Sequence, residues 1–166
     1  MKRALLGLVV AALTLLTACG TATPDAGPGS GTSGATVNSG SSPVGTYLVD
    51  SQGRALYLWV ADTGEASTCS GACAAAWPPL TVSGTPTAGQ GVDASKLGTI
   101  DRADGSKQVT YAKHPLYLFV QDKGRGELKG QGSTGFGAAW WLVKPDGSAI
   151  TTPVPTDVDP GGLPGY

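Results

Sequence analysis

Short runs of large apolar residues, separated by Gly, Asp and Pro, recur along the central part of this chain. The runs are rich in Val, Tyr, Trp, Phe and Leu, and a helical spacing of apolar positions is nearly absent. One short helical turn is expected at residues 70–77, where alanines favour a helix and Pro78 ends it. The pattern predicts a mainly β protein with strands over residues 46–49, 55–60, 97–100, 108–111, 116–120, 140–144 and 148–152.

Three turn signals separate these strands. Asp50, Asp104 and Asp146 each stand one to three residues before a glycine. An aspartate side chain can accept a nearby backbone N–H, and glycine can adopt a positive φ. The signals therefore predict hairpins and an antiparallel arrangement.

The chain also repeats itself. YLWVAD at residues 57–62 returns 60 residues later as YLFVQD, and each copy has a glycine two positions after its aspartate. Ala75-Ala76-Trp77 returns as Ala138-Ala139-Trp140. Each half alone has too few apolar residues for a core, so we expect two homologous β-rich repeats packed into one compact antiparallel domain that unfolds in a single transition. The repeats span about 44–82 and 97–145 within a domain of residues 44–152.

The first residues have the layout of a secretory leader. Lys2 and Arg3 precede an apolar run of about 13 residues, which is short of the ~20 needed for a transmembrane helix. Leu16-Thr17-Ala18-Cys19 resembles the bacterial lipobox, at which the leader is cut before a lipid-modified cysteine. We therefore expect a signal peptide at 1–18 and a lipid anchor on Cys19; an ordinary signal peptide that happens to contain a cysteine is the alternative.

The composition predicts a flexible tether and argues against nucleic acid as a partner. Residues 19–43 are nearly all Gly, Ser, Thr, Ala and Pro, which predicts a flexible tether, and residues 153–166 form a Pro/Gly-rich tail. Loss of the leader removes two of the 11 Lys and Arg and none of the 12 Asp and Glu, leaving a net charge of about −3. Without a basic cluster, no nucleic-acid partner is expected.

The tandem motif behind a lipobox resembles a known family. A tyrosine, an aromatic residue two positions later and an aspartate five positions later, written twice, is similar to the bacterial lipoproteins described as a secreted repeat of unknown function, with Yx(FWY)xxD motifs. The resemblance implies an extracytoplasmic, lipid-anchored, non-catalytic module without an established ligand. Its motif positions here are Tyr57, Trp59, Asp62, Tyr117, Phe119 and Asp122.

Residues two apart in a strand share a face, so each motif tyrosine pairs with the aromatic residue that follows it. We expect these aromatics to fill a core; the alternative is an exposed platform for a sugar or peptide, with Tyr57 and Tyr117 in a groove. The intervening side chains point the other way and predict strands buried on both faces, and these are Leu58, Val60, Leu118 and Val120.

The motif aspartates end their strands. Asp62 and Asp122 are each expected to accept backbone N–H groups and close a turn, with Gly64 and Gly124 at positive φ. Two aspartates could also bind a hard cation such as calcium, but the sequences DTGE and DKGR do not supply further acidic ligands. We therefore predict no metal and no cofactor here.

Cys69 and Cys73 are expected to form a disulfide, because cysteines four apart on a helical turn have Cα atoms about 6 Å apart. A structural staple near Trp77 is the favoured interpretation. The alternative is extracytoplasmic redox or copper handling, in which His114, the only histidine, would join the two sulfurs.

No activated nucleophile or acid pair can be placed from the sequence, so the chain is not expected to be an enzyme. We predict a non-enzymatic binding or structural role on the extracytoplasmic face of the cell membrane, with a possible cell-wall or envelope partner. Carbohydrate recognition through Trp77, Trp140 and Trp141 is a further candidate.

Overall fold

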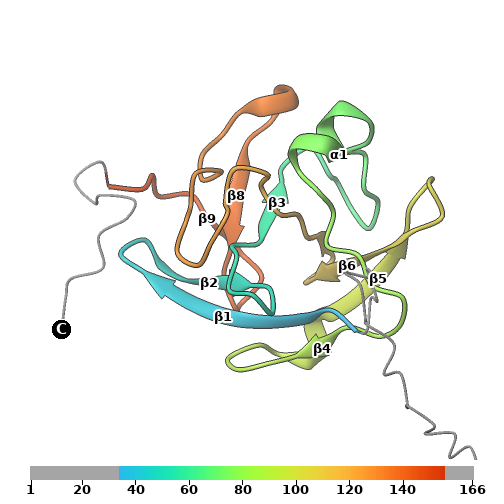
Figure 1. Ribbon diagram of the computed structural model, residues 1–166, viewed down its shortest axis with the longest axis horizontal. Helices are drawn as coiled ribbons and strands as arrows, with labels where there is room; N and C mark the ends of the chain where they lie inside the picture. Colours follow the sequence, from blue (N-terminus) through green and yellow to red (C-terminus); the bar gives the residue numbers. More distant parts are fainter. Residues whose placement is uncertain (1–33, 156–166) are drawn as a thin grey trace, which may run out of the picture. The chain divides into compact units, whose positions relative to one another are not determined.

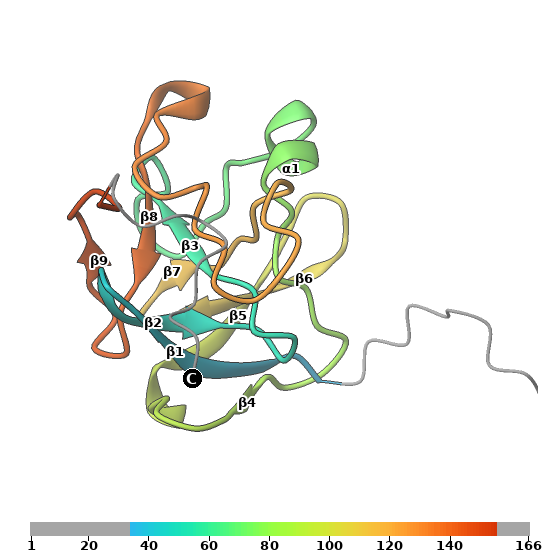
Figure 2. The same cartoon turned by 60° about the vertical axis from the view of Figure 1, so that its left-hand side comes forward.

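A computed structural model describes residues 34–155 (Figures 1 and 2). The strands form three sheets with the orders β2-β1-β4, β3-β8-β9 and β5-β6-β7. All pairs are antiparallel except β1 with β4, so the predicted mainly β, largely antiparallel fold is confirmed. The elements are β1 (Thr36–Ser42), β2 (Gly45–Val49), β3 (Tyr57–Trp59), α1 (Ala72–Ala76), β4 (Thr87–Ala88), the 3₁₀ turn η1 (Ala94–Lys96), β5 (Leu97–Asp101), β6 (Lys107–Tyr111), β7 (His114–Pro115), the 3₁₀ turn η2 (Gly135–Gly137), β8 (Trp140–Val143) and β9 (Ala149–Ile150).

Most of the predicted elements are present. The helix α1 lies within the predicted turn, and β2, β5, β6, β8 and β9 overlap their predicted ranges. The strand predicted at 116–120 is wrong, because β7 ends at Pro115 and Tyr117 makes only single bridges, to Tyr57 and to Pro79. Residues 116–120 instead pass between two different partners, which prevents a regular ladder.

The predicted tether at 19–43 is wrong over its last part. Residues 36–42 form β1, which pairs with β2 on one side and β4 on the other, as Figure 1 shows. Val37 is fully buried, and a Cβ at Gly40 would come within 2.9 Å of Val49, so a small residue is needed for the strands to approach. The expected leader and Cys19 lie outside the described residues, as do the tether before residue 34 and the tail beyond 155.

The three predicted turns are confirmed. The Oδ1 atom of Asp50 accepts the backbone N–H of Gln52 at 2.9 Å, and Asp104 and Asp146 accept those of Ser106 and Ser148 at 2.9 and 2.7 Å. A fourth turn, between β6 and β7, gave no sequence signal. It is made by two residues with positive φ that are not glycine, Ala112 (47°) and Lys113 (72°).

Two groups of buried side chains lie on opposite faces of β3, as the alternation of residues in a strand requires. Tyr57 and Trp59 belong to one group, and Leu56 and Leu58 to the other. The prediction that the motif strands are buried on both faces is wrong at their ends, where Val60 is 52% and Val120 42% exposed. No helix within residues 34–155 is long and apolar enough to cross a membrane.

Candidate functional site

The two motif segments, residues 57–62 and 117–122, meet at their tyrosines. The backbone N–H of Tyr57 donates to the carbonyl of Tyr117 at 2.9 Å, and the N–H of Tyr117 donates back to the carbonyl of Tyr57 at 2.9 Å. Equivalent positions of the two repeats thus bond to each other. This reciprocity places an approximate twofold axis between the two tyrosines.

Beyond this point each motif segment bonds to the Ala-Ala-Trp segment of the other repeat. Val60 donates its N–H to the carbonyl of Ala139 at 3.0 Å, and Val120 donates to the carbonyl of Ala76 at 3.0 Å. In the same sense, β3 of the first repeat pairs with β8 of the second, and Trp59 lies opposite Trp140. The repeats are therefore not two separate lobes in contact, because they exchange strand partners.

The motif side chains are exchanged in the same way. The hydroxyl of Tyr57 donates to Oδ2 of Asp122 at 2.6 Å, and the hydroxyl of Tyr117 donates to Oδ2 of Asp62. The tyrosines are 0% exposed and the aspartates 5% or less. Each tyrosine thus donates its hydroxyl to the aspartate of the other copy and not to the aspartate five residues further along its own motif.

The second oxygen of each aspartate closes a loop in its own repeat. Oδ1 of Asp62 accepts the backbone N–H of Thr68 at 2.8 Å, and Oδ1 of Asp122 accepts that of Lys129 at 2.9 Å. Gly64 has the expected positive φ of 86°. The expectation for Gly124 is wrong, because Gly126 has the positive φ in the second loop. This loop is one residue longer than the first, since seven positions separate Asp122 from Lys129 and six separate Asp62 from Thr68.

Four aromatic rings form one stack near the approximate twofold axis. Trp77 and Trp140 lie parallel at the centre, with ring centroids 4.0 Å apart and an angle of 2° between their planes. Trp59 stacks on Trp140 at 5.1 Å, and Phe119 stacks on Trp77 at 4.2 Å. The central pair comes from the two Ala-Ala-Trp segments and the outer pair from the two motifs, so the stack also follows the approximate symmetry.

The tyrosines touch this stack with their edges. Tyr57 lies 5.4 Å from Trp77 and Tyr117 lies 5.2 Å from Trp140, both nearly perpendicular to the indole plane. Such edge-to-face contacts are favourable for aromatic rings. Every aromatic residue of the motif and both tryptophans of the Ala-Ala-Trp segments therefore belong to one cluster.

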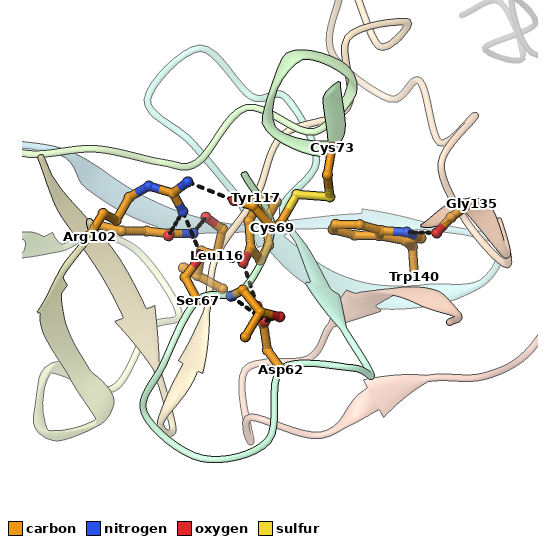
Figure 3. Close-up of a disulfide and its surroundings, with 11 residues drawn as sticks. Asp62, Ser67, Cys69, Cys73, Arg102, Leu116, Tyr117, Gly135 and Trp140 are labelled. Carbon is orange, nitrogen blue, oxygen red and sulfur yellow. Dashed lines mark hydrogen bonds between the residues drawn. A yellow bond between two sulfur atoms is a disulfide. The ribbon is translucent and has the colours of Figure 1, made fainter. Parts of the chain in front are cut away.

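Only the first repeat carries the disulfide. Cys69 and Cys73 are bonded, with Cα atoms 5.2 Å apart, as the sequence predicted, and are 1% and 7% exposed (Figure 3). The carbonyl of Cys73 accepts the N–H of Trp77 at 2.7 Å, which joins the staple to the central tryptophan. The disulfide therefore fixes one side of the aromatic cluster.

No sequence pattern indicated the role of Arg102. Its guanidinium is 5% exposed and donates to the carbonyl of Cys69 and to Oε1 of Gln108, both at 2.7 Å (Figure 3). It also donates to the hydroxyl of Ser67, which is 2.7 Å from that of Tyr117. A chain of hydroxyls thus joins a buried cation to the Asp62 carboxylate. An arginine in a turn between polar residues has no sequence pattern that would reveal this burial.

Burial, and then the partner carboxylate, raise the pKa of Tyr57 and Tyr117 well above the ordinary value of 10.0. Burial likewise raises the pKa of Asp122 above its ordinary value, although the hydrogen bond from Tyr57 opposes this. The arrangement holds two neutral phenols against two carboxylates. Each phenol is therefore a poor acid as long as the protein is folded.

These shifts predict a steep loss of stability in alkali. Above pH 10 the unfolded chain loses the two phenolic protons first, so the free energy of unfolding should fall by roughly 1.4 kcal/mol per pH unit for each tyrosine. Urea unfolding measured between about pH 9 and 12 checks this, because the slope should flatten in the double variant Tyr57→Phe/Tyr117→Phe. Phenolate absorbance from these residues in a still folded protein would contradict the burial of both pairs.

The structure bears on three of the binding alternatives, namely the aromatic platform, carbohydrate recognition and a cation site. Tyr57 and Tyr117 lie in no groove, so the aromatic platform is excluded, and Trp77 and Trp140 are too buried to stack on a sugar, which leaves only the half-buried Trp141. The aspartate oxygens are taken by tyrosines and backbone. Among residues 34–155, no group of three or more His, Cys, Asp or Glu side chains could hold a metal ion.

Comparison with known proteins places the chain in a family. The family model described as a secreted repeat of unknown function matches residues 39–81 and 98–144, one match to each repeat. The protein belongs to this family, and the resemblance seen in the sequence is confirmed. No curated protein and no solved structure matches the chain. The first match begins inside β1, which agrees with the observed strand and not with the predicted tether.

Proposed function

We propose that the protein is a lipid-anchored component of the extracytoplasmic face of the cell membrane. Three features support this proposal: the predicted leader at residues 1–18 directly before Cys19, membership of a secreted family, and the Cys69–Cys73 disulfide. Disulfides form and persist outside the reducing cytoplasm. A diacylglycerol anchor contributes roughly 0.8 kcal/mol for each buried methylene, which is enough for stable attachment.

Its role there is binding or structural and not enzymatic. The observation that carries this proposal is that the polar groups of the motif bond within the fold. In each Tyr–Asp pair both side chains are buried, and the tyrosine hydroxyl donates to the aspartate. An enzyme would instead present a reactive group to a substrate. Contacts with a cell-wall or envelope partner then fall to the outer surface, where Phe136 is 48% exposed.

The alternative, redox or copper handling through Cys69 and Cys73, is not favoured by a specific observation. A redox disulfide needs access for an attacking thiolate, and both cysteines are buried. Copper binding through these residues needs free thiolates, and the two sulfurs are bonded to each other.

The anchor is tested by replacing its cysteine in the full-length chain. Wild-type protein should incorporate labelled palmitate and lose its leader, whereas Cys19→Ser should lose the label and keep the leader, which is seen as a larger mass. The matched control is the double variant Cys69→Ala/Cys73→Ala, which removes two cysteines but should stay labelled and processed. Unchanged palmitate labelling of Cys19→Ser would refute the anchor.

A further inference from the structure

We propose that the outer edge of β5 binds an extended, uncharged peptide segment of a partner protein, which adds to the sheet as a further strand. The sheet order β5-β6-β7 leaves β5 at one edge, with β6 on its inner side. The proposal gives the binding role proposed above a site and a class of partner. It does not depend on the lipid anchor, which is tested separately.

Alternate residues of β5 turn their backbone groups away from β6. The N–H of Arg102, just after β5, donates to the carbonyl of Ser106 at 2.8 Å, which fixes the phase of the ladder. Bonded pairs recur at every second residue of an antiparallel ladder, so the even-numbered residues of β5 bond to β6. The N–H and carbonyl groups of Thr99 and Asp101 therefore point outward, and no hydrogen bond within residues 34–155 uses them.

The other sheet edges of the described chain are short or covered. β2 and β3 are bonded on their outer sides by residues 54–56 and by Tyr117. β4, β7 and β9 have two residues each, and the carbonyl of Ile150 in β9 accepts a hydrogen bond from the side chain of Gln131 at 2.6 Å. Folded proteins usually protect their strand edges, because open N–H and C=O groups there can pair with another chain. Between residues 34 and 155, β5 is the exception.

An open hollow of about 350 Å³ lies beside this edge. Its lining includes Leu97 and Thr99 of β5, Lys107 of β6, and Pro86 just before β4. Leu97 and Thr99 are two positions apart and share a face of the strand, so a strand added beside Thr99 places every second side chain on that face, over the hollow. Backbone bonds to a strand edge, combined with pockets for alternate side chains, are a known mode of peptide binding.

The charge of the hollow favours an uncharged chain. Lys107 is its only charged residue, and Nζ of Lys107 lies 2.6 Å from Oδ1 of Asp101, which balances the charge. The rest of the lining consists of Gly, Ala, Pro, Thr and Leu. A peptide with small or medium apolar side chains at alternate positions therefore fits, provided that the residue bonded to Thr99 is not proline, which has no N–H to donate.

A second copy of the chain fits this edge less well. In a twofold pairing of two β5 strands about Thr99, Asp101 of each copy would lie opposite Leu97 of the other, which places a carboxylate against an apolar side chain. The five residues of β5 extend over about 17 Å. Stable interfaces between whole proteins bury roughly 1,200–2,000 Å². The edge and its hollow therefore have the size of a site for a short segment of chain.

The test uses the full-length protein, labelled with ¹⁵N and purified in detergent, and a blocked pentapeptide of alternating threonine and valine as the probe. Without the peptide, the N–H groups of Thr99 and Asp101 should exchange with solvent at least about tenfold faster than those of Gly98 and Ile100, which bond to β6. Saturating peptide should slow exchange at Thr99 and Asp101 by about tenfold or more and leave the other two unchanged.

Two controls isolate the backbone pairing. The same peptide with methylated backbone nitrogens keeps its side chains but cannot donate hydrogen bonds, so it should not bind. In the protein, Thr99→Pro removes an outward N–H and should weaken binding of the probe by about tenfold or more, whereas Thr99→Val keeps that N–H and should bind within about twofold of wild type. Proline is tolerated where the N–H of an edge strand faces solvent, so Thr99→Pro is expected to fold.

Three results would overturn the proposal. The first is equal binding of the methylated peptide, and the second is unweakened binding by Thr99→Pro. The third is slow exchange at Thr99 and Asp101 without the peptide, because a second copy or the chain itself would then occupy the edge. If Thr99→Pro does not fold, the comparison of the two peptides on wild-type protein decides. Palmitate labelling of Cys19 is unaffected by any of these results, so a failure here is distinct from a failure of the anchor.

Discussion

Replacement of Trp140 by alanine is expected to lower the free energy of unfolding by about 3–5 kcal/mol, the range found for large aromatic side chains removed from a core. Trp140 is fully buried, stacks on both Trp59 and Trp77, and receives the edge of Tyr117. Its loss would also leave the carbonyl of Gly135 without its indole donor. Urea unfolding at neutral pH measures the effect.

The neighbouring tryptophan supplies the control. Trp141 is only half-buried and makes no ring stack with another aromatic residue of the described chain. Trp141→Ala should therefore cost less than half as much as Trp140→Ala. Equal losses at the two positions would mean that neither the greater burial of Trp140 nor its stacking adds to the stability of the fold.

The exchange of partners between repeats predicts a specific pattern of energetic coupling. Tyr57→Phe and Asp122→Ala remove the two ends of one buried hydrogen bond to a carboxylate, so a double-mutant cycle should show a coupling of roughly 1.5–3 kcal/mol. The same magnitude is expected for Tyr117→Phe with Asp62→Ala. Both cycles are read from the free energies of unfolding in urea.

The matched cycle uses the same tyrosine with the aspartate of its own motif. Tyr57→Phe with Asp62→Ala should be additive within about 0.5 kcal/mol, because these side chains form no hydrogen bond with each other. The two cycles change the same residue types. Strong coupling within a motif and none between motifs would show that each repeat is self-contained, contrary to the structure.

The reciprocal arrangement explains why the motif has its particular spacing. A strand places the tyrosine and the aromatic residue on one face, and the aspartate lies beyond the strand end, where its loop begins. Because the two motif segments run antiparallel where Tyr57 and Tyr117 bridge, the aspartate at the end of each segment lies beside the tyrosine of the other repeat. Each copy of the six-residue pattern thus supplies the hydrogen-bond partner of the other copy, and neither copy satisfies its own tyrosine and aspartate.

The burial of polar groups at this centre makes the two members of each Tyr–Asp pair depend on each other. A buried carboxylate without donors is strongly unfavourable, and a buried phenol without an acceptor costs about 1–3 kcal/mol. Here each aspartate has a phenol and a backbone N–H, and each tyrosine has a carboxylate. Replacement of one partner alone leaves the other unsatisfied, so the pair must be kept together.

Local features of the fold were predictable because local forces produce them. The turns at Asp104 and Asp146 depend on an aspartate oxygen that reaches a backbone N–H two residues away. The Cys69–Cys73 disulfide depends on the spacing of two residues on one helical turn. The turn at Ala112 and Lys113 was missed because neither residue favours the positive φ that it adopts.

The strand β1 was missed for a different reason. Residues 36–42 contain a single large apolar side chain, Val37, and otherwise have the composition of a linker. Their extended conformation is maintained by hydrogen bonds to β2 and β4 on both sides, a contribution that does not depend on hydrophobic alternation. Composition therefore indicated disorder where pairing with distant segments creates order.

The sequence by itself determined that the chain is built from two copies of one β-rich unit, that the motif aromatics belong to a core, and that two cysteines form a local staple. Those conclusions depend on periodicity and on short spacings. Only the tertiary structure decided that each tyrosine bonds to the aspartate of the other repeat, that Arg102 is buried beside Ser67, and that four rings form one stack. These contacts join residues 35 to 81 positions apart, and their partners are chosen by chain topology, which no local pattern encodes.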